Sequence, residues 1–336
     1  MQYSGRHFSG RRLVGLTFTV LGGFALTAGA LVHLYVGPRL IEAPTDVYQV
    51  TRLNAQNATY FDAGAMKMRK GATLTATSTI RGDVLSSHDD IAVWDSTTVV
   101  QDLSRKNTID IRADRVAFDR HTGRLVNCCG AAVKGDVTVP QSGIGLFWPV
   151  KVAKRDYPLF DFQLRRPLTI RYDGVESVHG VRTYRFVQDI PPTKVAERTP
   201  DIPGELLGLR RGGGVAVDRY YESHAVFWID PRTGAPVDQR RRVRSELRAK
   251  KGPGRLVVAD MDLRLTPESQ SALLSKVEDG ASAIRLLTTV VPLVCLAGGL
   301  VIVAFGTALS LRRDGREPRH RREIGEAPAT VGGWGP

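Results

Sequence analysis

Cysteine is scarce in this sequence, which contains three in 336 residues. That number excludes a small scaffold held together by several disulfides. Two of the three, Cys128 and Cys129, are neighbours, and adjacent thiols lack the C-x2-4-C spacing of zinc sites. We expect them to form a vicinal disulfide in an oxidising compartment, with free thiols or bonds to another chain as the alternatives. Cys295 lies in an apolar run, where we expect it to pack.

Catalytic and cofactor motifs are also missing. The histidines between residues 37 and 283 show neither helical i, i+4 spacing nor an H-E-x-x-H arrangement; they are His88, His121, His179 and His224. There is no G-x-S-x-G motif and no P-loop, and Asp89-Asp90 lacks the spacing of a calcium loop. We therefore expect no catalytic residue, no cofactor and no metal, in a protein that is not an enzyme.

Long apolar runs are absent from the middle of the chain, but one lies near each end. Leu13–Val36 and Leu286–Leu311 contain no Asp, Glu, Lys or Arg. A helix needs about 20 apolar residues to cross the hydrocarbon core of a bilayer. We expect two transmembrane helices, over 13–36 and 284–311, with the lipid bilayer as a partner. A cleaved signal peptide is the alternative for the first run, which is longer than the apolar region of about 7–15 residues that signals carry.

The charges that flank the two runs orient the protein. Arginines precede the first run, and six more follow the second: Arg6, Arg11 and Arg12, then Arg312, Arg313, Arg316, Arg319, Arg321 and Arg322. Short positively charged flanks stay cytoplasmic. We expect a two-pass plasma-membrane protein with cytoplasmic tails over 1–12 and 312–336, the second disordered, and residues 37–283 outside. The net charge is +13, but the basic residues are spread along the chain and form no basic stripe on a recognisable module. Nucleic acid is therefore not an expected partner.

Glycines inside the two runs permit close helix packing. Small residues let helix backbones approach one another in a membrane. The first run contains Gly22-Gly23 and Gly29, and the second contains Gly298-Gly299 and Gly306. The two helices of one chain are expected to pair with each other, or to form a homo-oligomer.

The central segment has the period-2 alternation of half-buried strands. The predicted strands are Thr73–Ile80, Ile91–Val100, Thr108–Phe118, Leu168–Tyr172, Val181–Val187, Tyr220–Ile229, Val237–Leu247 and Leu256–Leu265. Two D-x-x-T-G sequences, Asp119–Gly123 and Asp230–Gly234, predict tight turns, because Asp bonds to nearby backbone and Gly supplies a positive φ. The fold class is therefore α+β: an antiparallel, sheet-dominated domain, barrel- or sandwich-like, between two transmembrane helices. A helix is expected over Pro267–Val277, and a loop with a short helix over 191–214.

One aromatic stretch is the candidate ligand site. Apolar rings alternate there with cations, a combination suited to a lipid tail and its headgroup. The alternative is that the rings build the core and the cations lie on the surface. The candidate residues are Phe147, Trp148, Tyr157, Phe160 and Phe162, with Lys151, Lys154 and Arg155 as headgroup partners.

This stretch and three others resemble a known family. They are Gly145–Phe162, Tyr172–Glu176, Gly180–Phe186 and Trp228–Gly234. Together with the two-anchor layout they resemble an actinobacterial membrane-protein family, the porin PorA family, over about residues 10–312. The shared signatures are turns and core positions, so the resemblance implies no catalytic residue. The layout of anchor, sheet-rich domain and anchor is also similar to that of class B scavenger receptors, whose domain encloses a lipid tunnel but is longer and carries several disulfides.

The leading functional hypothesis is a double-anchored envelope protein that binds or passes a lipid or another apolar envelope component. A non-enzymatic scaffold for envelope proteins is the alternative. Pore formation is the lesser alternative, because arginines such as those at 240–244 interrupt the faces that a membrane-embedded barrel would turn to lipid.

Overall fold

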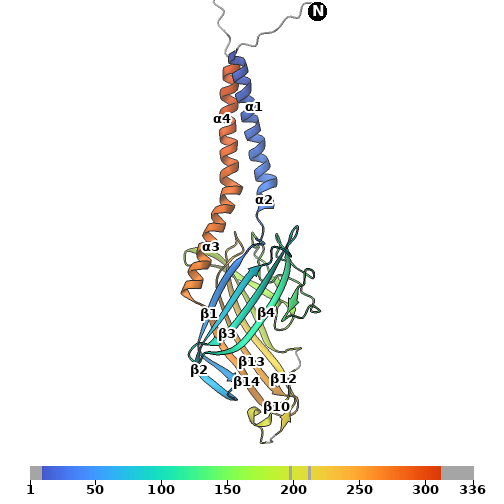
Figure 1. Ribbon diagram of the computed structural model, residues 1–336. Coiled ribbons are helices and arrows are strands. Elements are labelled where there is room, and N and C mark those ends of the chain that lie inside the picture. Colours follow the sequence, from blue (N-terminus) through green and yellow to red (C-terminus); the bar gives the residue numbers. More distant parts are fainter. Residues whose placement is uncertain (1–9, 197–198, 211–212, 312–336) are drawn as a thin grey trace, which may run out of the picture. The chain divides into compact units, whose positions relative to one another are not determined.

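The computed structural model describes residues 10–196, 199–210 and 213–311 (Figure 1). The predicted tail 312–336 and most of the tail 1–12 lie outside this part. The chain divides into two compact units, one formed by the residues up to Leu31 and from Val291 onward, the other by Val32–Val290.

The first unit is a pair of apolar helices, α1 (Gly10–Leu31) and α4 (Val291–Leu311). A Cβ on Gly22 would lie 2.8 Å from the carbonyl oxygen of Gly299, and one on Gly15 would lie 2.9 Å from that of Gly306. A Cβ on Gly29 would lie 2.8 Å from Cys295 Cβ. These three pairs of positions show that the two helices run antiparallel with their backbones in close contact. The close packing expected of these glycines is thus made within one chain.

Within the described residues, two helices are long and apolar enough to cross a membrane, Leu13–Val36 and Pro267–Leu311. The first coincides with the predicted span. The second begins earlier than expected, because α3 (Pro267–Arg285) continues through a π-helical turn, η3 (Leu286–Val290), into α4. Thr266 caps α3 by accepting a hydrogen bond from Ser269 N, and the first helix continues through η1 (Val32–Val36) into α2 (Gly37–Leu40).

The second unit is built on an antiparallel sheet. Its strands and its short 3-10 helix have these bounds: β1 Tyr48–Asp62, β2 Lys67–Gly82, β3 Ile91–Asp102, β4 Asn107–Asp119, β5 Leu125–Val126, β6 Ala132–Val133, β7 Tyr157–Asp161, β8 Arg166–Val178, β9 Val181–Lys194, β10 Ile202–Pro203, η2 Gly204–Leu207, β11 Gly214–Val215, β12 Val217–Ile229, β13 Pro236–Ala249 and β14 Arg255–Leu265. Every predicted strand is present, which confirms the sheet-dominated, antiparallel fold class.

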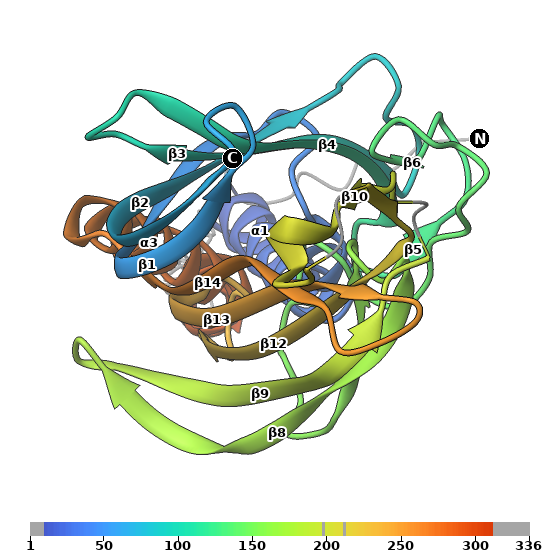
Figure 2. The ribbon, with the colours of Figure 1, turned by 90° about the horizontal axis from the view of Figure 1, so that it is seen from below.

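The main sheet is curled like a half-barrel, as Figure 2 shows from below. Its strand order is β5-β4-β3-β2-β1-β14-β13-β12-β9-β8-β7, with β6 beside β4. Backbone from the segment 143–145 joins the two edges: Leu125 N on β5 donates to Gly143 O, and Phe160 N on β7 donates to Ile144 O, both at 2.8 Å. The curl and this bridge make the barrel-like alternative the correct one.

β1 was not predicted, although it is among the longest strands. Its sequence YQVTRLNAQNATYFD places amide side chains in the middle, where strand propensity is weak. A bulge interrupts its pairing between Asn54 and Thr59, and Asn57 has a φ of +55°. The strand forms because β2 and β14 pair with it on both sides, a contribution of tertiary structure that local sequence does not reveal.

The two D-x-x-T-G sequences form tight turns, as predicted. In each, the Asp carboxylate accepts hydrogen bonds from the backbone and hydroxyl of the Thr three residues later. The closing glycines, Gly123 and Gly234, have φ of +68° and +75°. The region 191–214 contains the predicted short helix, η2 at Gly204–Leu207, but it differs from the predicted loop at its start, where β9 extends to Lys194.

Candidate functional site

Neighbouring arginines of β13 lie on opposite faces of the sheet. Arg240 and Arg242 are exposed, and Arg240 pairs with Asp262 of β14 at 2.6 Å on the outer face. Arg241 instead pairs in register with the buried Ala225 of β12, and its guanidinium lies 6.0 Å from the ring of Phe227. Because side chains alternate along a strand, Arg241 belongs to the inner face of the curl.

Four polar side chains belong to that inner face, and we call them the inner belt: Arg112 of β4, Asp161 of β7, Tyr221 of β12 and Arg241 of β13. Tyr221 is 4% exposed, and this burial raises the pKa of its hydroxyl. The charges of the other three members also act on Tyr221. Because β3, β2, β1 and β14 stand between β4 and β13 in the sheet, these charges approach Tyr221 from different sides of the curl.

Local contacts hold the inner belt in place. Arg112 Nε lies 2.8 Å from Asp114 Oδ2, and the guanidinium lies 5.7 Å from the Phe162 ring. Burial raises the pKa of the Asp114 carboxyl, while Arg112 beside it acts in the opposite direction. Asp161 accepts hydrogen bonds from the backbone of Gln163 and Leu164 at the start of the β7–β8 turn. A row of fixed charges of both signs can select among ions and polar solutes that approach it.

The predicted ligand-site residues do not form one site. Trp148 and Tyr157 are buried in one apolar cluster, with Phe186 and Ile229. Phe160 is buried in another cluster, against which Phe147 and Phe162 are half-buried. The three cations are exposed: Lys151, Lys154 and Arg155. This placement favours the alternative that the rings build the core, and a ligand role for these eight residues stays a prediction.

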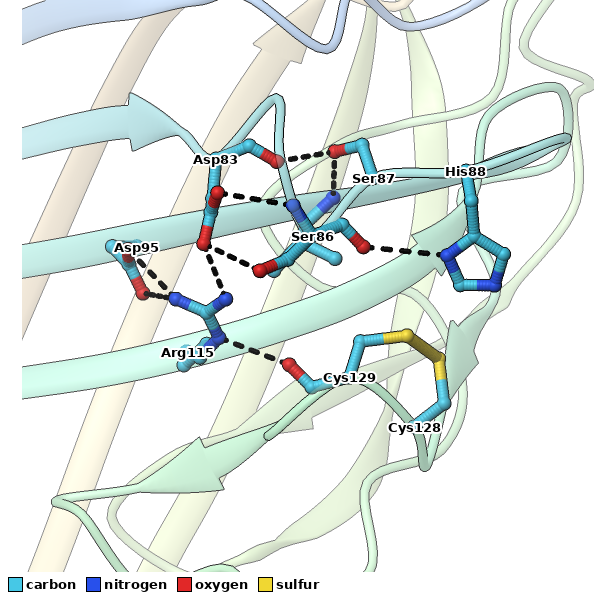
Figure 3. A network of polar contacts seen from close by, with 9 residues as sticks. Asp83, Ser86, Ser87, His88, Asp95, Arg115, Cys128 and Cys129 are labelled. Atoms are coloured by element: carbon cyan, nitrogen blue, oxygen red, sulfur yellow. Dashed lines mark hydrogen bonds and ion pairs between the residues drawn. A yellow bond between two sulfur atoms is a disulfide. The ribbon is translucent and has the colours of Figure 1, made fainter.

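Cys128 and Cys129 are joined by a disulfide (Figure 3). They pack partly against Val93 and Ala117. Arg115 Nε donates to the carbonyl oxygen of Cys129 at 3.1 Å, which ties the disulfide to the polar network of the β2–β3 loop. Tertiary contacts in the structure thus support a structural role for the pair.

Sequence reasoning missed the inner belt. The alternation in VDQRRRVRSEL separates Arg241 from Arg240 and Arg242, and this signal was present. The sequence did not show which face of β13 lies inside the curl. It also did not show that Arg112, on the distant strand β4, faces the same interior.

Comparison with known proteins identifies the family of this chain. The sequence model of the family described as Porin PorA matches residues 14–308. The chain belongs to the Porin PorA family. Porin PorA of Corynebacterium amycolatum is 26% identical over 177 residues, which are 42% of this chain and 46% of that protein. Porin PorA of Corynebacterium resistens is 22% identical over 295 residues, 65% of this chain and 70% of that protein.

Membership of this family, together with the two apolar helices, makes the chain a membrane protein. The match spans less than half of the C. amycolatum protein, so the activity that the shared name describes is treated below as a proposal. The likeness to class B scavenger receptors stays a prediction of architecture.

Proposed function

We propose that this protein is a porin-like protein of the cell envelope, in which two helices anchor the chain and the inner face of the curled sheet guides a polar or charged solute. The inner belt is the observation that supports this most, because Arg112, Asp161 and Arg241 are charged groups of the inner face that act electrostatically on a buried tyrosine, Tyr221. The proposal involves no catalytic step.

The outer face of the sheet supports a position in water and not in lipid. Arg240, Arg242 and Arg244 are exposed along β13, and Arg244 pairs with Glu246 of the same strand. A barrel embedded in a membrane needs an apolar outer band about 25 Å tall. In this proposal the two helices cross the plasma membrane, both termini are cytoplasmic as the arginine flanks suggest, and the sheet stands outside as a vestibule.

A pore through the bilayer itself then needs several copies, because two helices cannot enclose a channel. Gly22 and Gly299 are used within the chain, whereas a Cβ on Gly23 or Gly298 would meet no described atom within 4 Å. The surface around Gly23 and Gly298 is available for a second copy or another envelope protein, and small residues favour such helix contacts.

The test compares two neighbouring arginines in single-channel recordings of the full-length protein in planar bilayers. Arg241→Gln removes an inner-belt charge, and Arg242→Gln removes an outer one. We expect currents whose ion selectivity, read from the reversal potential in a salt gradient, shifts toward cations in Arg241→Gln and is unchanged in Arg242→Gln. Circular dichroism and thermal melting of both variants verify folding.

Absence of currents from well-folded protein would overturn the porin-like proposal, as would equal shifts in the two variants. Lipid carriage, the leading hypothesis from the sequence, has a separate readout in native mass spectrometry of detergent-purified protein. A defined lipid that stays bound to the wild type without any channel activity would favour lipid carriage over solute passage.

A further inference from the structure

Three segments that are distant in sequence meet where the chain passes from α2 into the sheet. Glu42 lies in the link between α2 and β1, Asp90 ends the β2–β3 loop, and His121 lies in the turn after β4. One ligand atom from each lies within 4.8 Å of the other two. We propose that these three side chains form a binding site for a divalent transition-metal ion, with Zn²⁺ as the best match to one imidazole and two carboxylates.

The distances suit a shared ion better than direct contacts. His121 Nε2 lies 3.7 Å from Glu42 Oε2 and 3.6 Å from Asp90 Oδ1, both beyond hydrogen-bond length. Zinc binds nitrogen and oxygen at about 2.0–2.1 Å, so two ligands of a tetrahedral ion lie about 3.3 Å apart. A displacement of a few tenths of an ångström would therefore bring His121 and either carboxylate to a shared ion, and the two carboxylate oxygens, which lie within 4.8 Å of each other, would approach to complete the site.

The three segments are held together by backbone hydrogen bonds, so the ligands do not depend on flexible side chains for their approach. Arg120 N donates to Asp90 O at 2.8 Å, and Ala43 N donates to Arg120 O at 2.8 Å. Asp119 Oδ1 accepts from His121 N at 3.1 Å, which fixes the turn that carries the imidazole. A prearranged ligand set loses little conformational entropy on binding a metal.

Arg120 acts as a positioning residue. Its guanidinium lies 2.6 Å from Glu42 Oε1, and its Nε donates to Ala43 O at 2.8 Å. This pairing occupies one carboxylate oxygen and leaves Oε2 facing His121. Groups that hydrogen-bond to a metal ligand orient it and tune its affinity. The metal would lock the link from the first helix to two loops of the sheet, independently of any role as a porin.

The experiment is isothermal titration of tag-free, full-length protein in detergent with ZnCl₂. We expect one Zn²⁺ per chain, bound more than about tenfold more weakly by His121→Asn and by Asp90→Asn. The matched control is His88→Asn, which changes another histidine of the same region that lies outside the cluster. Because Asp90 is 73% exposed at its side chain, Asp90→Asn tests the site without disturbing packing.

A second measurement uses Co²⁺ as a coloured substitute for zinc. The wild type and His88→Asn should show the intense visible bands of tetrahedral cobalt, and His121→Asn and Asp90→Asn should not. Equal zinc affinity and equal cobalt spectra in the wild type and in Asp90→Asn and His121→Asn would overturn the proposal. Loss of binding in His88→Asn alone would overturn it as well, because the ion would then lie elsewhere.

Discussion

Arg115 gathers three partners on the outer face of the sheet. Its guanidinium pairs with Asp83 at 2.5 Å and with Asp95 at 2.9 Å, and it also donates to the Cys129 carbonyl (Figure 3). Asp83 additionally accepts hydrogen bonds from the backbone and hydroxyl of Ser86. One arginine thus connects the β2–β3 loop, strand β3 and the disulfide.

This network predicts a pH-dependent contribution to stability. Hydrogen bonding to Arg115 lowers the pKa of Asp83 from 3.8 to about 2. A carboxyl with a lowered pKa stabilises the fold above its unfolded-state pKa, and this stabilisation is lost as the pH falls from about 3.8 through about 2. Asp83→Asn should therefore lower the melting temperature at pH 6 but have little effect at pH 2. Asp89→Asn in the same loop is the control, and a melting-temperature difference that persists unchanged to pH 2 would contradict the prediction.

A buried hydroxyl provides a second test at this scale. Tyr60 is fully buried, and its hydroxyl donates at 3.0 Å to Asp102, which is also fully buried and paired with Arg105. Tyr60→Phe removes a hydrogen bond to a buried carboxylate and should lower the free energy of unfolding by about 1–3 kcal/mol. Tyr48→Phe, at a residue that is 71% exposed, should change it little. Denaturant titration measures the free energy of unfolding of both variants. A change in Tyr60→Phe as small as that in Tyr48→Phe would show that the Tyr60 hydroxyl contributes nothing.

At the scale of elements, the turns between strands set where distant segments meet. The turn after β12 ends at Gly234. A Cβ added to this glycine would lie 2.7 Å from the carbonyl oxygen of Trp148 and 2.6 Å from that of Pro149. The turn after β4 ends at Gly123, and a Cβ added there would lie 2.7 Å from the carbonyl oxygen of Phe147. The repeated turn sequence therefore places two strand ends against one continuous stretch of the aromatic segment.

Replacement of Gly234 by alanine should reveal this contact as a loss of thermal stability. Gly234→Ala adds a clash with two carbonyl oxygens to the usual cost of a positive φ, which is about 1 kcal/mol. Gly180→Ala, in the β8–β9 turn, carries the φ cost alone, since its φ is +80° and no described atom lies within 4 Å of its Cβ position. We expect Gly234→Ala to lower the melting temperature more than Gly180→Ala. A near-ultraviolet spectrum altered only in Gly234→Ala would report the displaced Trp148, and equal melting temperatures would refute the contact.

At the scale of the whole molecule, two units of opposite character share one chain. The helical unit has an apolar surface, with Phe24 71% and Val301 69% exposed, as a bilayer requires. The sheet unit has an outer face of paired charges, such as Arg240 with Asp262, that requires water. The chain can satisfy both only where a membrane meets an aqueous layer, which agrees with a membrane protein of the Porin PorA family.

Helix pairing in the first unit is testable with the native Cys295. A Cβ on Gly29 would lie 2.8 Å from Cys295 Cβ, about 1 Å closer than in a disulfide, so a small widening of the helix pair should let the Gly29→Cys variant form an intrachain disulfide with Cys295 on mild oxidation. Adding Gly22→Leu should slow this oxidation several-fold, because a side chain at Gly22 meets backbone of α4. Adding Gly23→Leu should not, since Gly23 faces no described atom within 4 Å. Loss of free thiol over time measures the rate, and equal rates would argue against this pairing.

The amino-acid sequence by itself determined the two apolar helices, the antiparallel strands and the two turns. These features depend on local periodicity and on the residues at corners, such as Asp119 with Gly123, and such signals are contained within a short stretch of chain. The vicinal disulfide was one of three alternatives that the sequence left open, because two neighbouring cysteines with no other partner in the central segment could also stay reduced or bond to another chain.

Tertiary structure alone decided which side of each strand is inside. Alternation in β13 separates Arg241 from Arg242, but only the curl of the sheet turns Arg112 of the distant strand β4 toward the same interior as Arg241 and Tyr221, which lie on the adjacent strands β13 and β12. The same holds for Glu42, Asp90 and His121, which turns and backbone hydrogen bonds bring together although the first and the last are 79 positions apart in the sequence. The tertiary structure also places most of the aromatic rings in the core. The sequence could not show this, because an aromatic residue next to a cation has the same sequence pattern whether its ring is buried or open to a ligand.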